Sequence, residues 1–301
     1  MAQKAMDNNR QKIIVIVGPT SSGKSDLGIM LARKFNGEII SADSRQVYRG
    51  MNIGTGKVTK KEQRMVRHHL LDVASPKNIF TAGEFKRLGQ KVLSDIAKRT
   101  KTPIIVGGTG FYIDAMLERA SLAEVPPNPK LRARFDKLTV KKLFEKLKKS
   151  DPARAAAIDR HNKRRLIRAL EIIDALGKVP RPPTRTPQVR ILWLGLKPGD
   201  LDKKIGIRLD KRLRKGMMRE IKKLREKGVS WKRFYAFGLE YRWVSLYLRG
   251  KLTYKEMRNG LLRDIIKYSK RQMTWFKRNK EIHWLKNQKQ AVRLVRDFLR
   301  T

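Results

Sequence analysis

Eight consecutive residues near the start of the chain have the types and spacing of a phosphate-binding loop. Gly18-Pro-Thr-Ser-Ser-Gly-Lys-Ser25 fits G-x-x-x-x-G-K-[ST], and it lies between an apolar run and a helical pattern, as this motif requires. The backbone N–H groups of such a loop surround phosphate oxygens, and the following helix adds partial positive charge. Lys24 is expected to neutralise the terminal phosphate, and Ser25 to place its hydroxyl on Mg²⁺. The loop therefore predicts a diphosphate or triphosphate ligand without identifying the molecule that carries it.

A carboxylate is expected beside this loop. The apolar run Glu38–Ser41 predicts a strand, and Asp43 follows it directly. The carboxyl ends of parallel strands face the ligand crevice of an α/β sheet, so Asp43 is placed where it can act as a base. A role as a magnesium ligand or helix cap remains open for this residue. No hydrophobic strand ends in the Asp-Glu pattern of an ATP hydrolase, which argues against that reading of the loop.

Apolar, β-branched runs alternate with helical patterns over most of the chain. This alternation predicts the α/β class, with a phosphate-loop parallel-sheet core, an inserted helical domain and a helical C-terminal part. The expected strands are Lys12–Val17, Glu38–Ser41, His68–Val73, Pro103–Val106 and Val189–Leu196, and the first helix is expected at Ser25–Phe35. Residues 200–301 are expected to be all helical, with breaks at Gly228, Gly238 and Gly250.

Two proline-rich segments predict the domain boundaries. Pro126-Pro-Asn-Pro129 opens a stretch of helical patterns dense in lysine and arginine, and Arg181-Pro-Pro-Thr184 closes it. We therefore expect a catalytic core made of residues 1–118 and 187–301, and a helical insertion of residues 119–186.

The charge of the chain favours a polyanionic partner. The 301 residues include 72 basic and 27 acidic side chains, a net charge of +45, and residues 201–301 hold 31 of the basic and 9 of the acidic ones. A field of this size favours nucleic acid, although a general basic bias would give the same composition. Cysteine is absent, which excludes disulfides and thiolate metal sites. Met1–Lys12 is polar, and no apolar run is long enough to cross a membrane, so a cytoplasmic location without membrane association is expected.

An ordered set of short motifs over about residues 12–285 resembles the tRNA dimethylallyltransferase family, also called the tRNA isopentenyltransferase family. With no cysteine for a zinc finger, the chain is similar to the bacterial form. Besides the phosphate loop, the motifs are Ser41-Ala-Asp-Ser-Arg-Gln-Val-Tyr48, Gly50-Met-Asn-Ile-Gly-Thr-Gly-Lys57, His68-His-Leu-Leu-Asp72, Phe80-Thr-Ala-Gly-Glu-Phe85, Pro103-Ile-Ile-Val-Gly-Gly-Thr-Gly-Phe-Tyr112, Arg164-Arg-Leu-Ile-Arg-Ala-Leu-Glu171, Gly238-Leu-Glu240 and Lys270-Arg-Gln-Met-Thr-Trp-Phe276.

The resemblance implies a reaction and its partners. Members transfer a dimethylallyl group from dimethylallyl diphosphate to N6 of adenosine 37 of tRNA, which gives N6-dimethylallyladenosine and pyrophosphate. It also implies Mg²⁺ as cofactor, and an inserted helical domain that binds the anticodon stem-loop. We expect a monomer.

The resemblance also implies residue roles. Asp43 matches the general base, and Thr20 and Lys24 complete the expected catalytic set. Ser25 is the expected metal ligand. The expected donor diphosphate-binding residues are Gly18, Pro19, Thr20, Ser21, Ser22, Gly23, Lys24, Ser25 and Arg233. The expected tRNA-binding residues are Asp43, Ser44, Arg45, Gln46, Thr109, Arg164, Arg165, Leu166, Ile167, Arg168, Arg271 and Gln272.

The sequence departs from the family pattern near the expected site. Ser21 stands where the family's phosphate loop usually has alanine, and no proline follows Lys57. Gly56 replaces the alanine of the family's G-M-D-I-G-T-A-K motif. The family also has a diphosphate-binding arginine shortly before the Gly238 motif. Arg233 is nearby in the sequence, but the aligned position can equally be that of Tyr235, so this assignment stays open.

Three other functions remain open from the residues alone. The phosphate loop suits an ATP-dependent phosphotransferase or an RNA-stimulated ATPase. A relative that prenylates free adenine nucleotides would not need the basic insertion. A non-catalytic RNA-binding protein would not need Lys24, Ser25 and Asp43 together.

Overall fold

The protein is described by a computed structural model that covers residues 11–180 and 189–301. It divides into two compact units: unit 1 is Met1–Leu117 with Thr186–Thr301, and unit 2 is Glu118–Arg185. The segment Arg181–Thr184, predicted to close the insertion, lies outside the described residues. Over the described ranges, no helix has both the length and the apolar character needed to cross a membrane.

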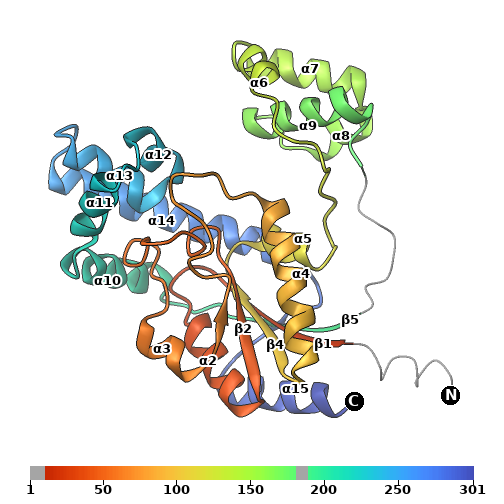
Figure 1. The fold of residues 1–301 in the computed structure, drawn as a ribbon, viewed down its shortest axis with the longest axis vertical. Coiled ribbons are helices and arrows are strands. Elements are labelled where there is room, and N and C mark those ends of the chain that lie inside the picture. Colours follow the sequence, from red (N-terminus) through yellow and green to blue (C-terminus); the bar gives the residue numbers. More distant parts are fainter. Residues whose placement is uncertain (1–10, 181–188) are drawn as a thin grey trace. The chain divides into compact units, whose positions relative to one another are not determined.

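Unit 1 is built on a six-stranded sheet with the order β3-β2-β4-β1-β5-β6 (Figure 1). Every pair of neighbouring strands is parallel, so the predicted α/β class is confirmed. The central strands are continuous apolar runs buried on both faces, which is why the sequence shows little alternation in them. The strands are β1 (Gln11–Val17), β2 (Gly37–Ala42), β3 (His68–His69), β4 (Thr102–Gly107), β5 (Val189–Gly195) and β6 (His283–Trp284).

The two edge strands differ from the prediction. β3 ends at His69 rather than Val73, because Leu70 and Asp72 adopt left-handed φ angles of 61° and 57° that turn the chain out of the sheet. β6 was not predicted. It consists only of His283 and Trp284, which pair with the end of β5, and two residues carry no readable periodicity.

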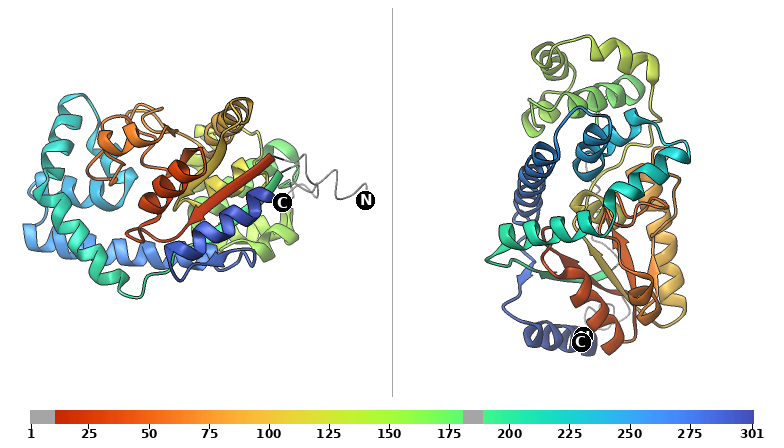
Figure 2. Two further views of the ribbon diagram at one scale, coloured as in Figure 1. Left: turned by 90° about the horizontal axis from the view of Figure 1, so that it is seen from below. Right: turned by 90° about the vertical axis from the view of Figure 1, so that its left-hand side faces the viewer.

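Helices cover both faces of the sheet (Figures 1 and 2). Ile14, Ile16 and Ile104 face helices α2 (Lys24–Lys34) and α15 (Gln288–Arg300), whose buried side chains share one cluster with them. The opposite face packs against α4 (Ala82–Lys98) and α5 (Gly110–Met116). The short α3 (Lys60–Met65) begins with a capping box between Thr59 and Glu62.

Five helices lie between β5 and β6 in the sequence and belong to the same unit. They are α10 (Leu201–Arg214), α11 (Met217–Glu226), α12 (Trp231–Phe237), α13 (Leu239–Leu248) and α14 (Tyr254–Phe276). The predicted breaks at Gly228, Gly238 and Gly250 fall between these helices, and each glycine has a positive φ. A further break at Gly216, φ 106°, was not predicted. Their apolar faces join the large cluster on the α4 side of the sheet.

Unit 2 is all helical where the structure describes it. Its helices are α6 (Pro129–Asp136), α7 (Val140–Ser150), α8 (Pro152–Ala157) and α9 (Lys163–Leu176). Leu143, Leu147 and Leu166 are fully buried and form the centre of a separate core. Asn128, Thr139, Asp151 and Asn162 cap the four helices with their side chains, which fixes where each one begins.

Candidate active site

Three neighbouring strands of unit 1 end at the same level. Val17 and Ala42 are both in register with Gly107. The next residues along each strand are the phosphate loop, Asp43 and the Gly108-Thr109 turn. Asp43 therefore lies at the same edge of the sheet as the phosphate loop, as the sequence predicts.

The phosphate loop has the backbone conformation that its sequence requires. Gly23 has a φ of 85° and Ser21 a φ of 62°, so the chain makes a left-handed turn before α2 begins at Lys24. The first N–H groups of α2 have no partner within the helix and can face an anion. The ammonium of Lys24 donates to the carbonyl oxygen of Pro19 at 2.9 Å. Burial, together with the positive charge of Arg208, lowers the pKa of Lys24 to about 8, while Asp43 acts in the opposite direction.

Asp43 is held by the backbone that follows it. Its Oδ1 accepts hydrogen bonds from the N–H of Arg45 at 2.8 Å and from the N–H of Gln46 at 3.3 Å. Among the described residues Oδ2 has no hydrogen-bond partner. The carboxylate is thus oriented through one oxygen, and the other can accept a proton.

The turn after β4 is tied to the Asp43 loop. Thr109 accepts a hydrogen bond from the N–H of Ser44 through its hydroxyl at 3.1 Å. Tyr268 of α14 lies near Thr109 and Asp43, and burial together with the charge of Asp43 raises its pKa to about 12. The phenol therefore stays neutral at ordinary pH and can donate a hydrogen bond.

Gln272, also on α14, connects two of these loops. Its Oε1 accepts from the N–H of Thr20 at 2.9 Å, and its Nε2 donates to the carbonyl of Gly108 at 2.9 Å. The side chain is buried. Gln272 was predicted to bind tRNA, which stays a prediction; in the structure its side-chain amide links the phosphate loop to the turn after β4.

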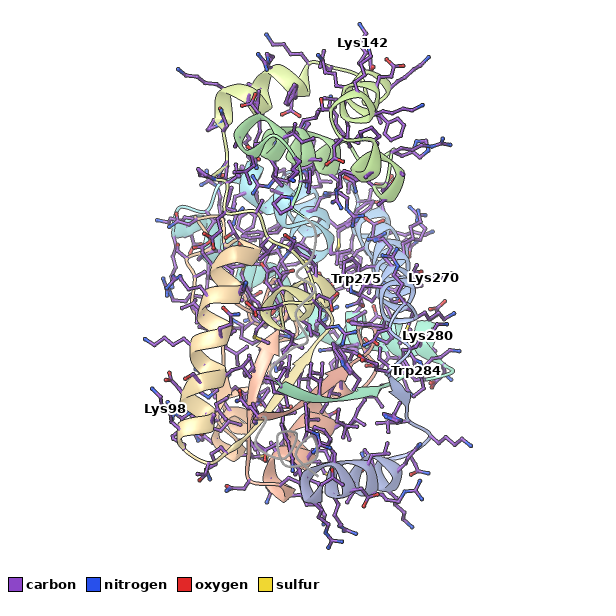
Figure 3. The ribbon with its side chains drawn as sticks, turned by 90° about the vertical axis from the view of Figure 1, so that its right-hand side faces the viewer. Lys98, Lys142, Lys270, Trp275, Lys280 and Trp284 are labelled. Carbon is purple, nitrogen blue, oxygen red and sulfur yellow. The ribbon has the colours of Figure 1, made fainter. Side chains whose placement is uncertain are left out.

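Neighbouring Arg271 is exposed, and its guanidinium lies 5.8 Å from the centre of the Tyr268 ring. Figure 3 shows Lys270 and Lys280 on the outside of unit 1, whereas Trp275 lies inward. Trp275 is only partly buried, and its indole donates to Asp114 at 3.1 Å. The end of α14 and the turn that follows it therefore present basic side chains outward.

Arg45 and Arg233 are engaged within unit 1. Arg45 donates to the carbonyl of Phe237 at 3.0 Å. Arg233 donates to the carbonyls of Pro76 and Asn78 and to the hydroxyl of Tyr48, and its guanidinium lies 4.3 Å from the centre of the Phe237 ring. None of these partners belongs to the phosphate loop, which Arg233 was predicted to assist.

Helix α10 contributes two arginines that the sequence analysis did not select. Arg208 donates to the carbonyl of Gly56 at 3.2 Å, and Arg212 donates to the carbonyl of Gly54 at 2.7 Å. They are four residues apart and so lie on one face of the helix. Burial and the nearby charge of Arg212 lower the pKa of Arg208, while Glu240, Asp43 and Asp26 act in the opposite direction. The helical spacing was visible in the sequence, but it is common in a chain with 72 basic residues.

The segment from Gly50 to Lys57 is fixed by a buried carboxylate. Glu220 of α11 accepts from the N–H groups of Asn52, Ile53 and Gly54 at 2.6–3.0 Å. The hydroxyl of Tyr241 also donates to Glu220, at 2.8 Å. These bonds hold the Gly50–Lys57 motif in a tight loop against α10.

In unit 2 the predicted RNA-binding segment divides into three kinds of residue. Arg164 and Arg165 are exposed. Arg168 pairs with buried Glu171 at 2.6 Å and donates to two backbone carbonyls. Leu166 and Ile167 are buried in the core of unit 2, so their side chains are not available to RNA.

The described ranges contain no cluster of three or more histidine or acidic side chains that could hold a metal ion. The hydroxyl of Ser25, in the first turn of α2, is the protein group whose chemistry and place suit a magnesium ion shared with a bound diphosphate.

Comparison with known proteins shows that this chain is similar to one family of enzymes over nearly its whole length. The family model "IPP transferase" matches residues 46–279. tRNA dimethylallyltransferase 1 of Geotalea uraniireducens is 39% identical over 294 residues, which cover 96% of this chain and 97% of that protein. The crystal structure of full-length tRNA isopentenylpyrophosphate transferase from Bacillus halodurans is similar with a TM-score of 0.72 and 34% identity, over 97% of each chain. A eukaryotic dimethylallyltransferase acting on tRNA gives a TM-score of 0.77 at 27% identity, over 91% of this chain and 73% of that one.

Proposed function

The chain belongs to the IPP transferase family, and we propose that it transfers a dimethylallyl group from dimethylallyl diphosphate to N6 of adenosine 37 of tRNA. The observation that carries this proposal is the placement of Asp43 beside the phosphate loop, through the shared register of Val17 and Ala42 with Gly107. A phosphotransferase needs the loop, whereas a transfer to an amine also needs a base at the same edge of the sheet.

In the proposed reaction one C–N bond forms, one C–O bond breaks, and one proton moves to Asp43. The N6 lone pair of adenosine attacks C1 of the dimethylallyl group, and the C1–O bond breaks with its electron pair leaving on pyrophosphate. N6 loses one proton to Oδ2 of Asp43. The exocyclic amine is a weak nucleophile because its lone pair is delocalised into the ring, so proton transfer to a positioned carboxylate assists the attack.

The phosphate loop stabilises the leaving group. Negative charge that develops on the pyrophosphate oxygens meets the N–H groups at the start of α2 and the ammonium of Lys24. Thr20 is kept in place for donor contact by the bond from its N–H to Gln272. A Mg²⁺ ion on the Ser25 hydroxyl would add positive charge to the same oxygens.

We propose that unit 2 and the outer side of α14 bind the tRNA anticodon stem-loop. Arg164 and Arg165 on α9 and Arg271 on α14 are exposed and can neutralise backbone phosphates. The loop from Asp43 to Gln46 and Thr109 would contact the target nucleotide, which must leave its stack to reach the carboxylate. We expect the working enzyme to be a monomer.

The test is a reconstitution with purified protein, Mg²⁺, radiolabelled dimethylallyl diphosphate and tRNA transcripts. We expect label in N6-dimethylallyladenosine, with pyrophosphate released only when donor and tRNA are both present. A transcript with guanosine at position 37 is the matched control, because it has no N6 amine, and it should take up no label. ATP hydrolysis stimulated by tRNA, without transfer of label, would replace this proposal with an ATPase.

A further inference from the structure

Phe111 of α5 exposes an aromatic ring close to the candidate site. It is the one exposed phenylalanine of the ten in the chain, all of which lie in the described ranges, and 39% of its surface is accessible. The other large apolar residues of the same helix, Tyr112, Ile113 and Met116, are buried. A single exposed apolar side chain is common in proteins, so the surroundings of Phe111 decide whether it has a role.

The ring of Phe111 is held against Trp275 of α14. The two ring centres are 6.3 Å apart with an angle of 81° between the planes. The indole of Trp275 donates to Asp114 at 3.1 Å, and Asp114 lies one turn along α5 from Phe111, on the same face. An edge-to-face pair of this kind uses at most one face of the Phe111 ring, so the exposed part of the ring is available to a flat partner.

The chain around Phe111 places it at the rim of the site. Thr109, two residues earlier, donates its N–H to the carbonyl of Ala42 at 3.2 Å and accepts from the N–H of Ser44 at 3.1 Å. Ala42 and Ser44 are the two neighbours of Asp43 in the sequence. The Cα atom of Phe111 lies within about 7 Å of that of Thr109, because only two peptide units separate them.

Cations surround this aromatic pair. The guanidinium of Arg278 lies 5.5 Å from the centre of the Trp275 ring, and both Arg278 and Arg271 are exposed. Figure 3 shows Lys270 and Lys280 on the outside of the same region. Aromatic rings for bases and cations for the backbone are the combination that binds single-stranded nucleic acid. The net charge of +45 favours this occupant over an uncharged apolar one.

We propose that Phe111 stacks on an unpaired base next to the target adenosine in the anticodon loop. When the target adenosine leaves its stack, each neighbouring base loses one stacking partner. The ring of Phe111 replaces that partner for one of the two neighbours, and so holds the loop while the adenosine lies at Asp43. The identity of the RNA rests on the proposed function, whereas the stacking contact is a property of this surface.

The experiment measures equilibrium binding of a labelled anticodon stem-loop RNA to the full chain, without donor. Phe111→Leu keeps an apolar side chain but removes the ring, and it should weaken binding about fivefold or more. Phe111→Trp should bind nearly as the wild type does. Tyr254→Leu is the matched control, because it removes a ring that is 45% exposed at the start of α14, about 30 Å along the helix from Trp275. It should change the affinity less than twofold.

Two modified RNAs identify the stacked base. Each has an abasic nucleotide on one side of the target adenosine, and Phe111→Leu should lose its effect with one of them, because the base that stacks is already missing. Thermal unfolding should show that Phe111→Leu is folded.

Equal affinity of the wild type and the folded Phe111→Leu variant for the intact stem-loop would overturn the inference, as would a loss that persists with both abasic RNAs. Weaker binding of dimethylallyl diphosphate with unchanged RNA binding would show that the ring contacts the prenyl tail instead. If RNA affinity depends on Phe111 but no prenyl group reaches tRNA, the proposed function fails while the stacking role of Phe111 stands.

Discussion

Gln272 accepts a hydrogen bond from the backbone N–H of Thr20 at 2.9 Å, although 252 residues separate the two in the sequence. The bond joins the long helix α14 to the phosphate loop, and the other end of the same amide holds Gly108. A Cβ atom at Gly108 would lie 2.1 Å from the Gln272 amide, so glycine is needed for this approach. Helix α14, which also carries Tyr268 and Arg271, thereby fixes the geometry of the donor site.

Gln272→Ala should weaken donor binding rather than tRNA binding. It leaves the N–H of Thr20 and the carbonyl of Gly108 without partners, at a cost of about 1–3 kcal/mol for each buried group. We expect lower affinity for dimethylallyl diphosphate and a lower unfolding temperature, measured by titration and calorimetry. Gln11→Ala is the control, because Gln11 makes a similar bond to Leu93 at the far end of β1. A fall in tRNA affinity with unchanged donor affinity would contradict this prediction and would show that Gln272 contacts tRNA directly.

Asp43→Asn should lower the single-turnover transfer rate by roughly 10²-fold or more, with donor and tRNA affinities nearly unchanged. Asparagine keeps the Oδ1 acceptor for the N–H groups of Arg45 and Gln46, so the loop retains its shape. Only the ability to take a proton is lost. A near wild-type rate in rapid-quench measurements would show that Asp43 is not the base.

The central strands were predictable because each is marked by the types of its own residues and of the residues next to it in the sequence. β1, β2, β4 and β5 are apolar runs bounded by turn residues, and they end within two residues of their predicted limits. β3 was predicted too long because Leu70 is apolar, like a strand residue, yet adopts a φ of 61°. The hydropathy of a residue does not indicate its φ angle. β6 depends on pairing with β5 and leaves no pattern of its own.

The parts of the candidate site that directly follow a strand in the sequence were predictable. Gly18–Ser25 and Asp43 follow strands directly, so strand order places them. Arg208 comes to the same region from a helix beginning 94 residues after β4 ends, and only the packing of α10 brings it there. Leu166 and Ile167 were predicted to bind tRNA together with the exposed arginines of the same motif. The helical period turns their side chains into the core of unit 2, and tRNA binding by this segment stays a prediction.

Glu38 should make the stability of unit 1 depend on acid pH. Its burial raises its pKa, but hydrogen bonds from Arg99 and His69 outweigh burial and hold the pKa below the usual value of 4.5. A carboxylate with a lowered folded-state pKa stabilises the protein above its unfolded pKa, and this contribution is lost as pH falls through the folded pKa. Urea unfolding should therefore show declining stability below about pH 4.5.

Glu38→Gln should destabilise the protein by roughly 1–3 kcal/mol at neutral pH and flatten that acid decline. Glu145→Gln removes the same charge from an exposed site on α7, and it should leave both quantities unchanged. A Glu38→Gln curve parallel to the wild-type curve would mean that this buried pair does not contribute to the acid response.

Arg164 and Arg165 should act on tRNA, whereas Arg168 should act on the stability of unit 2. The first two are exposed on α9. Arg168 instead pairs with Glu171, which is 1% exposed and also binds Arg132. Replacing Arg164 and Arg165 together with alanine should weaken tRNA binding and reduce its salt dependence by about one to two counterions, because fewer phosphates are neutralised.

Filter binding over a range of salt concentrations measures the slope of the logarithm of the tRNA binding constant against the logarithm of the salt concentration. Lys91→Ala with Lys98→Ala is the matched control, since it removes two exposed charges from α4, and it should leave the slope unchanged. Arg168→Ala should keep the slope but lower the resistance of unit 2 to proteolysis, because Glu171 loses one of its partners and the carbonyls of Ala123 and Val125 lose their donor. If Arg168→Ala flattens the slope while unit 2 stays resistant, the guanidinium exchanges Glu171 for a phosphate on binding, and Arg168 belongs with the RNA-binding residues after all.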